Sequence, residues 1–375
     1  MSLSLPSLAS TLRVATFNVS MEATNYLAAG EQASGLELFT QLENGDNRQI
    51  RNIAEIIQRV RPDVILLNEF DYHVNPDKGI KAFIKRYLKA AQHEETQGID
   101  YPYFYTAPVN TGVDSGSDLD KDGIASGKGG DAFGFGFFPG HYGMALLSKY
   151  PIDVTSIRSF QHFLWKDMPD GLLDSIKDES GQAWYSAEAK KIFRLSSKSH
   201  WDVPLIIGDE VVHILASHPT PPVFDGPEDR NGKRNHDEVR FWLDYIVGGE
   251  SASYIYDDNE QRGGLGDKHF VIMGDLNSSA DEGDGHKGAI SALLAHPRVN
   301  NAIKPSSVGG KQQRPDNVQA PYHTASWGMR ADYVLPSVNL NTIGSGVFWP
   351  STEHPLVEHR SLSSDHRLVW IDIQL

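Results

Sequence analysis

Short apolar runs that stop at a polar residue recur along this chain. They are rich in β-branched and large aliphatic residues, and near-continuous runs of this length are typical of strands buried on both faces. The runs are residues 13–17, 63–67, 211–215, 269–273 and 368–373. The pattern therefore predicts several buried strands with polar residues gathered near their ends.

Apolar residues at helical spacing alternate with these runs. Residues 47–60 place isoleucines on one stripe. Residues 235–247 begin with Asn235, and Glu238 three positions later completes a capping-box pattern. Residues 288–295 predict a third, shorter helix. Helices interleaved with strands favour a layered α/β or α+β fold.

Residues 108–143 depart from both patterns because they are crowded with Gly and Asp. We expect a loop insertion, and long loops in compact domains are commonly functional. Asp118, Asp120 and Asp122 match the first half of a calcium-binding loop, but Gly129 stands where a bidentate Glu belongs. A Ca²⁺ site at these three aspartates and ordinary Asx-turns both fit the pattern, so both interpretations stay open.

Composition sets limits on the chemistry. The 375 residues are 39% apolar, 10% aromatic and 22% charged, which is typical of a soluble globular protein, and no apolar run is long enough to span a membrane. The chain has no cysteine, so disulfides, a Cys nucleophile and thiolate metal sites are excluded. The length alone favours two or more domains.

The charge balance bears on the partners. With 34 Lys and Arg against 49 Asp and Glu, the net charge is −15, which disfavours a broad basic face for nucleic acid. Clustered carboxylates are instead what a divalent cation requires. We expect a monomer with a disordered N-terminus over residues 1–11. No intact leader is visible, so export after leader removal and a cytoplasmic location both stay open.

Polar residues suited to metal and acid–base chemistry stand near the ends of the predicted strands. Hydrolysis of a phosphate ester needs neutralised phosphoryl oxygens, an activated water and a stabilised leaving oxygen. Carboxylates that hold a hard cation supply the first, and His and Asp side chains supply the others. The residues are, in chain order, Asn18, Glu69, His218, Asp275, Asn277, Asp332, Asp365 and His366.

Taken together in this order, these residues and their neighbours resemble the endonuclease/exonuclease/phosphatase family of metal-dependent phosphoesterases. The resemblance rests on the segments Thr-Phe-Asn-Val, Leu-Asn-Glu-Phe, Ser-His-Pro, Gly-Asp-Leu-Asn-Ser, Ala-Asp-Tyr-Val and Ser-Asp-His-Arg. It covers residues 13–375 and implies a four-layered sandwich of two facing mixed β-sheets with helices on the outer faces. It also implies one domain over residues 1–375 in place of the two or more that length favours.

The resemblance implies a metal site and an activated water. Glu69 is expected to be the principal ligand of Mg²⁺ or Mn²⁺, with Asn18 beside it. Asp365 is expected either to be a further ligand or to hold His366. Asp275 would position or deprotonate the attacking water. Asn277 would orient that water or the phosphate, because two residues apart on a strand share one side.

Histidines complete the expected site. Asp332 would fix the tautomer of His366, and His218 would donate to a phosphate oxygen. The identity of the general base stays open. Further residues are expected to contact the substrate, namely Asn110, Lys198, His200 and Arg330.

These observations predict a divalent-metal-dependent phosphatase or phosphodiesterase. The loop insertion carries five Asp against Lys121 and Lys128, which favours small or lipid-linked phosphate esters over nucleic acid, with a nuclease of the same family as the alternative. A non-catalytic calcium-binding module, suggested by residues 118–123, is the alternative from another class.

Overall fold

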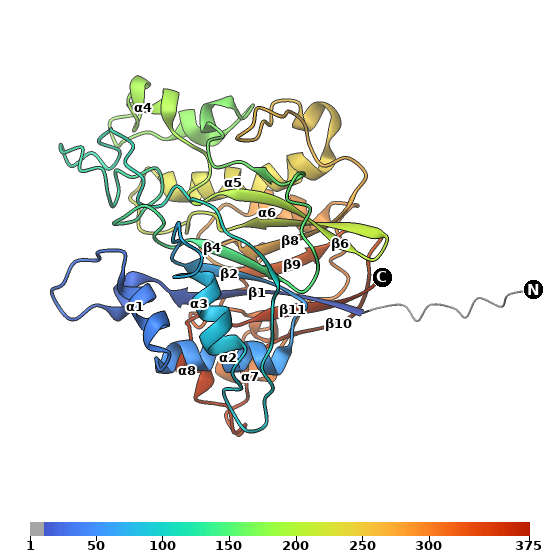
Figure 1. Cartoon of the computed structure of the whole chain (residues 1–375). Helices are drawn as coiled ribbons and strands as arrows, with labels where there is room; N and C mark the ends of the chain where they lie inside the picture. Colours follow the sequence, from blue (N-terminus) through green and yellow to red (C-terminus); the bar gives the residue numbers. More distant parts are fainter. Residues whose placement is uncertain (1–10) are drawn as a thin grey trace, which may run out of the picture.

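Two facing mixed β-sheets with helices on their outer faces form the molecule (Figure 1). The computed structural model describes residues 11–375; residues 1–10 of the N-terminus predicted to be disordered lie outside the described residues, whereas Thr11 already begins a strand. One sheet has six strands in the order β10-β11-β1-β2-β4-β3, and the other has five in the order β5-β6-β7-β8-β9. The predicted four-layered sandwich is confirmed.

The strands and helices follow one another closely along the chain. The strands are β1 Thr11–Met21, β2 Val64–Phe70, β3 Tyr103–Tyr105, β4 Met144–Ser148, β5 Arg158–Ser159, β6 His200–Ile207, β7 Glu210–Ser217, β8 His269–Asp275, β9 Asp332–Pro336, β10 Asn341–Val347 and β11 Val369–Gln374. The helices are α1 Glu37–Asn44, α2 Arg48–Val60, α3 Ile80–Phe83, α4 Ala187–Ile192, α5 Arg230–Val247, α6 Lys287–Ala295, α7 Val308–Gln313 and α8 His359–Leu362.

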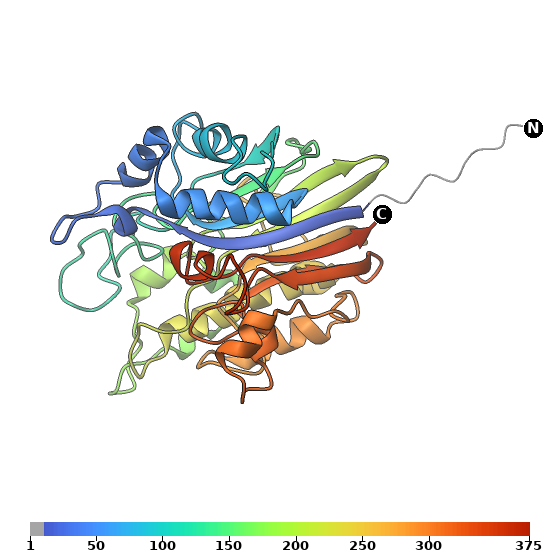
Figure 2. The same cartoon turned by 90° about the horizontal axis from the view of Figure 1, so that it is seen from below.

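The strand pairing places the two chain ends at one end of the sandwich and the carboxyl ends of four strands at the other. β1 pairs antiparallel with β11, so Thr11 lies opposite Gln374, and Figure 2 shows the two ends of the described chain side by side. β1 runs parallel to β2, and β7 runs parallel to β8. The carboxyl ends of these four strands lie at the other end of the sandwich, where side chains of both sheets meet.

Side chains along each strand point alternately to the two faces of the sheet, and the inward-pointing ones form the core between the sheets. Val14, Leu66, Ile214 and Val271 face the space between the sheets and belong to one buried cluster. Neighbouring residues such as Phe17 face outward into separate clusters beneath the helices, because successive strand side chains point to opposite faces. Each fully buried aliphatic side chain stabilises the fold by roughly 1.5–3 kcal/mol.

The helix predictions hold at α2 and α6 and fail at the start of α5. The side chain of Asn47 caps α2 by accepting from the backbone of Ile50 (3.2 Å). α5 begins at Arg230, five residues before the predicted start, so the capping-box prediction for Asn235 and Glu238 is wrong. Both side chains are buried inside the helix and bind other segments, which a local capping pattern cannot reveal.

Residues 106–143 join β3 to β4 through turns and isolated bridges, without a helix or strand of their own. A buried pair ties this segment to the end of β1, since His141 Nε2 lies 2.8 Å from Glu22 Oε2. In the part of the chain that the structure describes, no helix is long and apolar enough to cross a membrane.

Candidate active site

The candidate site is the polar end of the core between the sheets. The inner-facing rows that are apolar along most of each strand continue into polar side chains at one end, and these side chains are buried. They are Thr16 and Asn18 on β1, Asn68 on β2, His218 just after β7, Asp275 at the end of β8 and Asp332 at the start of β9. Strand alternation therefore brings residues from both sheets to one place.

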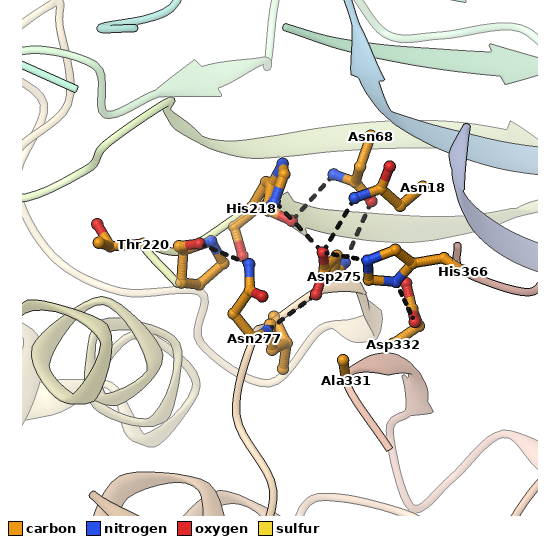
Figure 3. Close-up of polar contacts among 12 residues, drawn as sticks. Asn18, Asn68, His218, Thr220, Asp275, Asn277, Ala331, Asp332 and His366 are labelled. Atoms are coloured by element: carbon orange, nitrogen blue, oxygen red, sulfur yellow. Dashed lines mark hydrogen bonds and ion pairs between the residues drawn. The ribbon is translucent and has the colours of Figure 1, made fainter. Parts of the chain in front are cut away.

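Asp275 is the centre of this site (Figure 3). Its Oδ2 accepts from Asn18 Nδ2 (3.1 Å) and lies 3.4 Å from His218 Nε2 and 3.5 Å from His366 Nε2. Burial opposes ionisation, but His366 and the donated hydrogen bonds hold the pKa of Asp275 well below its usual range. Gly274 permits this placement, because a Cβ there would lie 2.0 Å from the Ser217 carbonyl oxygen.

His366 forms a buried ion pair with Asp332. Its Nδ1 lies 2.9 Å from Asp332 Oδ2, which also accepts from Thr324 Oγ1 (2.7 Å). Burial disfavours the imidazolium, but Asp332 and Asp275 raise the pKa of His366 to about 10. Trp327 packs edge-on against the ring, with centroids 4.8 Å apart. His366 is thus a fixed, positively charged donor aimed at Asp275.

His218 differs from His366 in charge. Burial, followed by the nearby charge of Lys198, lowers the pKa of His218 to about 4, so the ring is neutral at pH 7. Its Nδ1 is buried without a hydrogen-bond partner among the described residues. The site therefore places a neutral and a charged imidazole on the same carboxylate.

Glu69 and Asp365 face an open groove of 1020 Å³ beside Asp275. Glu69 has left-handed backbone (φ 55°), a conformation that costs free energy for a residue with a side chain. Burial raises the pKa of Glu69 to about 7, and the charges of Asp365 and Asp275 add to the effect. A divalent cation would relieve this repulsion, and Mg²⁺ often uses only one or two protein carboxylates. The residues present fit such an ion.

Asn18 presents its amide nitrogen, not its oxygen, to Asp275. Its Oδ1 accepts from the backbone N–H of Ser20 (3.1 Å), and its Nδ2 donates to Asp275. A backbone donor fixes the orientation of the amide, because that N–H needs an acceptor. The structure shows Asn18 as a donor that holds a carboxylate, and its role as a metal ligand stays a prediction.

Asn277 lies near Asp275 for a reason other than the predicted one. β8 ends at Asp275, and Asn277 has left-handed backbone (φ 50°), so the strand-face argument is wrong. The backbone N–H of Asn277 donates to Asp275 Oδ1 (3.0 Å), and its Nδ2 donates to the Pro219 carbonyl (3.1 Å). Asn277 joins the segments that follow β7 and β8.

Two residues predicted to contact the substrate, Asn110 and His200, form hydrogen bonds inside the fold instead. The Asn110 amide donates to the carbonyls of Gln161 and Ser196 and accepts from Arg194. His200 is buried, with Nδ1 on Ser196 Oγ (2.6 Å) and Nε2 on the Glu238 carbonyl (2.9 Å). Neither side chain has a group left for substrate, so both predictions are wrong.

The other two predicted contacts, Arg330 and Lys198, are also buried. The Arg330 guanidinium stacks over Tyr333, with 4.4 Å to the ring centroid, so packing against the fold explains its position. Lys198 lies close enough to the site for its charge to shift the pKa of His218.

The environment of His200 predicts a pH effect on stability. Burial lowers the pKa of His200 to about 4, from an ordinary value of 6.5. Between these values the unfolded chain binds a proton that the folded chain does not, so stability falls as the pH falls. We expect this residue to lower the free energy of unfolding by ~2 kcal/mol from pH 7 to pH 5. Urea unfolding of the wild type and His200→Gln measures it; an equal decrease in both proteins would contradict the assignment.

The predicted calcium loop is arranged differently from the expectation. Asp118, Asp120 and Asp131 have carboxylate oxygens within 4.8 Å of one another, whereas Asp122 is outside this group. Asp131 already accepts from the backbone of Leu119 (2.7 Å). The prediction of Asp122 as a ligand is wrong, and the remaining cluster is explained by hydrogen bonds that order the loop.

Sequence reasoning missed three residues that hold the site together. Asn68 Oδ1 accepts from the backbone N–H of Asp275 (3.1 Å), and Thr324 holds Asp332. Glu238 accepts from the backbone of Ser197 and of Thr220, both at 2.6 Å. Strand alternation could have revealed Asn68, which continues the inner-facing row of β2. No local signal marks Glu238, because its partners are distant in the sequence, and Thr324 lies in a loop whose turn toward Asp332 no sequence pattern predicts.

Comparisons with known proteins agree with this geometry. The Endonuclease/Exonuclease/phosphatase family profile matches residues 15–366, whereas a comparison with curated proteins finds no significant match. An endonuclease/exonuclease/phosphatase from Beutenbergia cavernae is similar in structure, with 17% identity, a TM-score of 0.52 and coverage of 97% of this chain and 72% of that one.

Two further solved structures are less similar. An endonuclease/exonuclease/phosphatase family protein from Leptotrichia buccalis has 15% identity and a TM-score of 0.49, covering 97% of this chain and 100% of that one. Staphylococcus aureus beta toxin with bound magnesium ions has 14% identity and a TM-score of 0.44, covering 96% and 99%.

Proposed function

The chain belongs to the endonuclease/exonuclease/phosphatase family, whose members are metal-dependent phosphoric ester hydrolases, and on that premise we propose that it hydrolyses small, polar phosphate esters. The observation that carries the proposal is the meeting of His218, His366 and Asn18 on Asp275, beside a groove that Glu69 and Asp365 line. Membership of an enzyme family also disfavours the non-catalytic calcium-binding alternative.

Each residue of the site has a separate role in the proposed reaction. Glu69 and Asp365 would hold Mg²⁺ or Mn²⁺, and the bound ion would neutralise charge on the phosphoryl oxygens. Asp275 orients the attacking water, whose oxygen forms a bond to phosphorus as the bond to the leaving oxygen breaks. The proton that the water loses ends, overall, on the leaving oxygen. His366, kept charged by Asp332, stabilises the negative charge that develops on the phosphoryl group. His218, through Nε2 at 3.4 Å, helps to hold Asp275 in position.

The groove supports the choice of substrate. Most of its wall consists of amide and hydroxyl side chains, among them Asn25, Gln49, Gln313, Ser326, Thr352 and Ser361. Its carbon-rich side chains are Tyr26, Leu362 and Trp349. Acyl chains would remove this polar wall from water, which costs free energy. Of the two predicted substrate types, small polar esters fit this wall better than lipids.

A substrate panel at one magnesium concentration tests the proposal. We expect faster hydrolysis of glycerophosphocholine and bis-p-nitrophenyl phosphate than of sphingomyelin vesicles or plasmid DNA. Preferential nicking of plasmid DNA would support the nuclease alternative instead, and preferential cleavage of vesicles would support a lipid substrate.

A further inference from the structure

Lys198 lies two residues before β6, in a backbone segment fixed on both sides. Its carbonyl accepts from the backbone of Asn110 (2.9 Å), and Glu238 holds the preceding residue Ser197. Because His200 pairs with Ser217, the register places Lys198 beside the segment after β7 that carries His218. Lys198 therefore approaches the site from the five-stranded sheet.

The Lys198 side chain is largely buried, and its ammonium has no partner among the described residues. The residue is 6% exposed, and within residues 11–375 no hydrogen bond or ion pair joins its ammonium group to another side chain. Glu238, the nearby carboxylate with the strongest electrostatic effect on it, is occupied by two backbone N–H donors. A largely buried ammonium without an anionic partner costs free energy. Because the end of this side chain is not fully enclosed, a ligand can reach the ammonium and supply the missing anion.

The charge of Lys198 acts on the site. Among the separate causes that shift the pKa of His218, the charge of Lys198 is second only to burial. Glu69 and Asp275 in turn act on Lys198. The carboxylates proposed to hold the cation, Glu69 and Asp365, are both at the six-stranded sheet, since Glu69 is on β2 and Asp365 precedes β11. A phosphate between the two sheets would meet a bound cation on one side and Lys198 on the other.

We propose that Lys198 is a catalytic residue that binds a non-bridging oxygen of the scissile phosphate, from the side of the phosphate away from Glu69 and Asp365. The proposal rests on the proposed function. Lys198 forms and breaks no covalent bond and keeps its proton, and it compensates the charge that develops as water attacks phosphorus. A phosphate ester bound at this position supplies the partner that the ammonium lacks within the folded chain.

Substitution of Lys198 separates this role from a structural one. We expect Lys198→Met to lower kcat/KM on bis-p-nitrophenyl phosphate on the order of 100-fold, as for loss of a single transition-state donor. The same variant is expected to keep or raise the melting temperature, because it removes a buried charge without a partner. Lys198→Arg, which keeps the charge, is expected to recover part of the activity. Lys128→Met, at an exposed lysine, is the control.

Inorganic phosphate provides a readout that is independent of turnover. In the presence of Mg²⁺, phosphate is expected to raise the melting temperature of the wild type and of Lys128→Met but not of Lys198→Met. An active wild type with an equally active Lys198→Met, or equal stabilisation of both by phosphate, would overturn the role of Lys198 and leave the proposed function intact. A wild type that binds phosphate but hydrolyses no phosphate ester would instead overturn the proposed function.

Discussion

Replacing His366 with Gln is expected to lower kcat on the preferred phosphate ester by about a thousandfold. Gln preserves a hydrogen-bonding side chain but removes the positive charge that lies 2.9 Å from Asp332 and 3.5 Å from Asp275. The transition state then loses a charged donor, and KM should change much less than kcat. Steady-state kinetics give both values, and circular dichroism verifies that the variant is folded.

His354→Gln is the matched control for this substitution. His354 is exposed and lies outside the site, so its replacement should leave kcat unchanged. Asp332→Asn tests the same ion pair from its other member and should give a smaller loss, because the His366 ring keeps a hydrogen-bond partner. A His366→Gln variant with kcat within tenfold of the wild type would show that His366 has no central role.

Replacing Glu69 with Gln is expected to raise the Mg²⁺ concentration needed for half-maximal activity by about 10-fold to 100-fold. Glu69 is one of two carboxylates proposed to hold the cation, and Gln removes the negative charge while keeping the shape. Activity titrated with Mg²⁺ measures the shift, and magnesium-induced thermal stabilisation measures binding without turnover. The control is Glu353→Gln, which removes an exposed carboxylate elsewhere. An unchanged magnesium midpoint would exclude Glu69 as a ligand.

Five of the eleven strands, β1, β2, β7, β8 and β11, and helix α2 could be predicted because their signals are local. Apolar runs mark buried strands, and the spaced isoleucines with Asn47 mark a capped helix. The first turn of α5 could not, because its residues are polar and Asn235 and Glu238 form an equally plausible cap pattern further on. Only the tertiary structure shows that these two side chains bind segments next to the site.

The chemistry of the site was predictable, whereas the orientation of single groups was not. Asp275 and Asp332 lie in the inner-facing rows of β8 and β9, and His366 lies in the loop that precedes β11. The three side chains therefore meet at one end of the sandwich. An amide such as Asn18 offers either an oxygen or a nitrogen, and its distant partners decide which one faces the carboxylates. His200 illustrates the same limit, since both of its ring nitrogens are used by residues outside its own strand.

The most direct test of metal-dependent phosphoester hydrolysis at this site is the release of p-nitrophenol from bis-p-nitrophenyl phosphate. Wild type and Asp275→Asn are compared with Mg²⁺ or Mn²⁺ and again with excess EDTA. We expect turnover by the wild type with metal, loss of turnover in EDTA and a loss of at least about 100-fold in Asp275→Asn. Turnover that persists in EDTA, or equal rates for the two proteins, would contradict it.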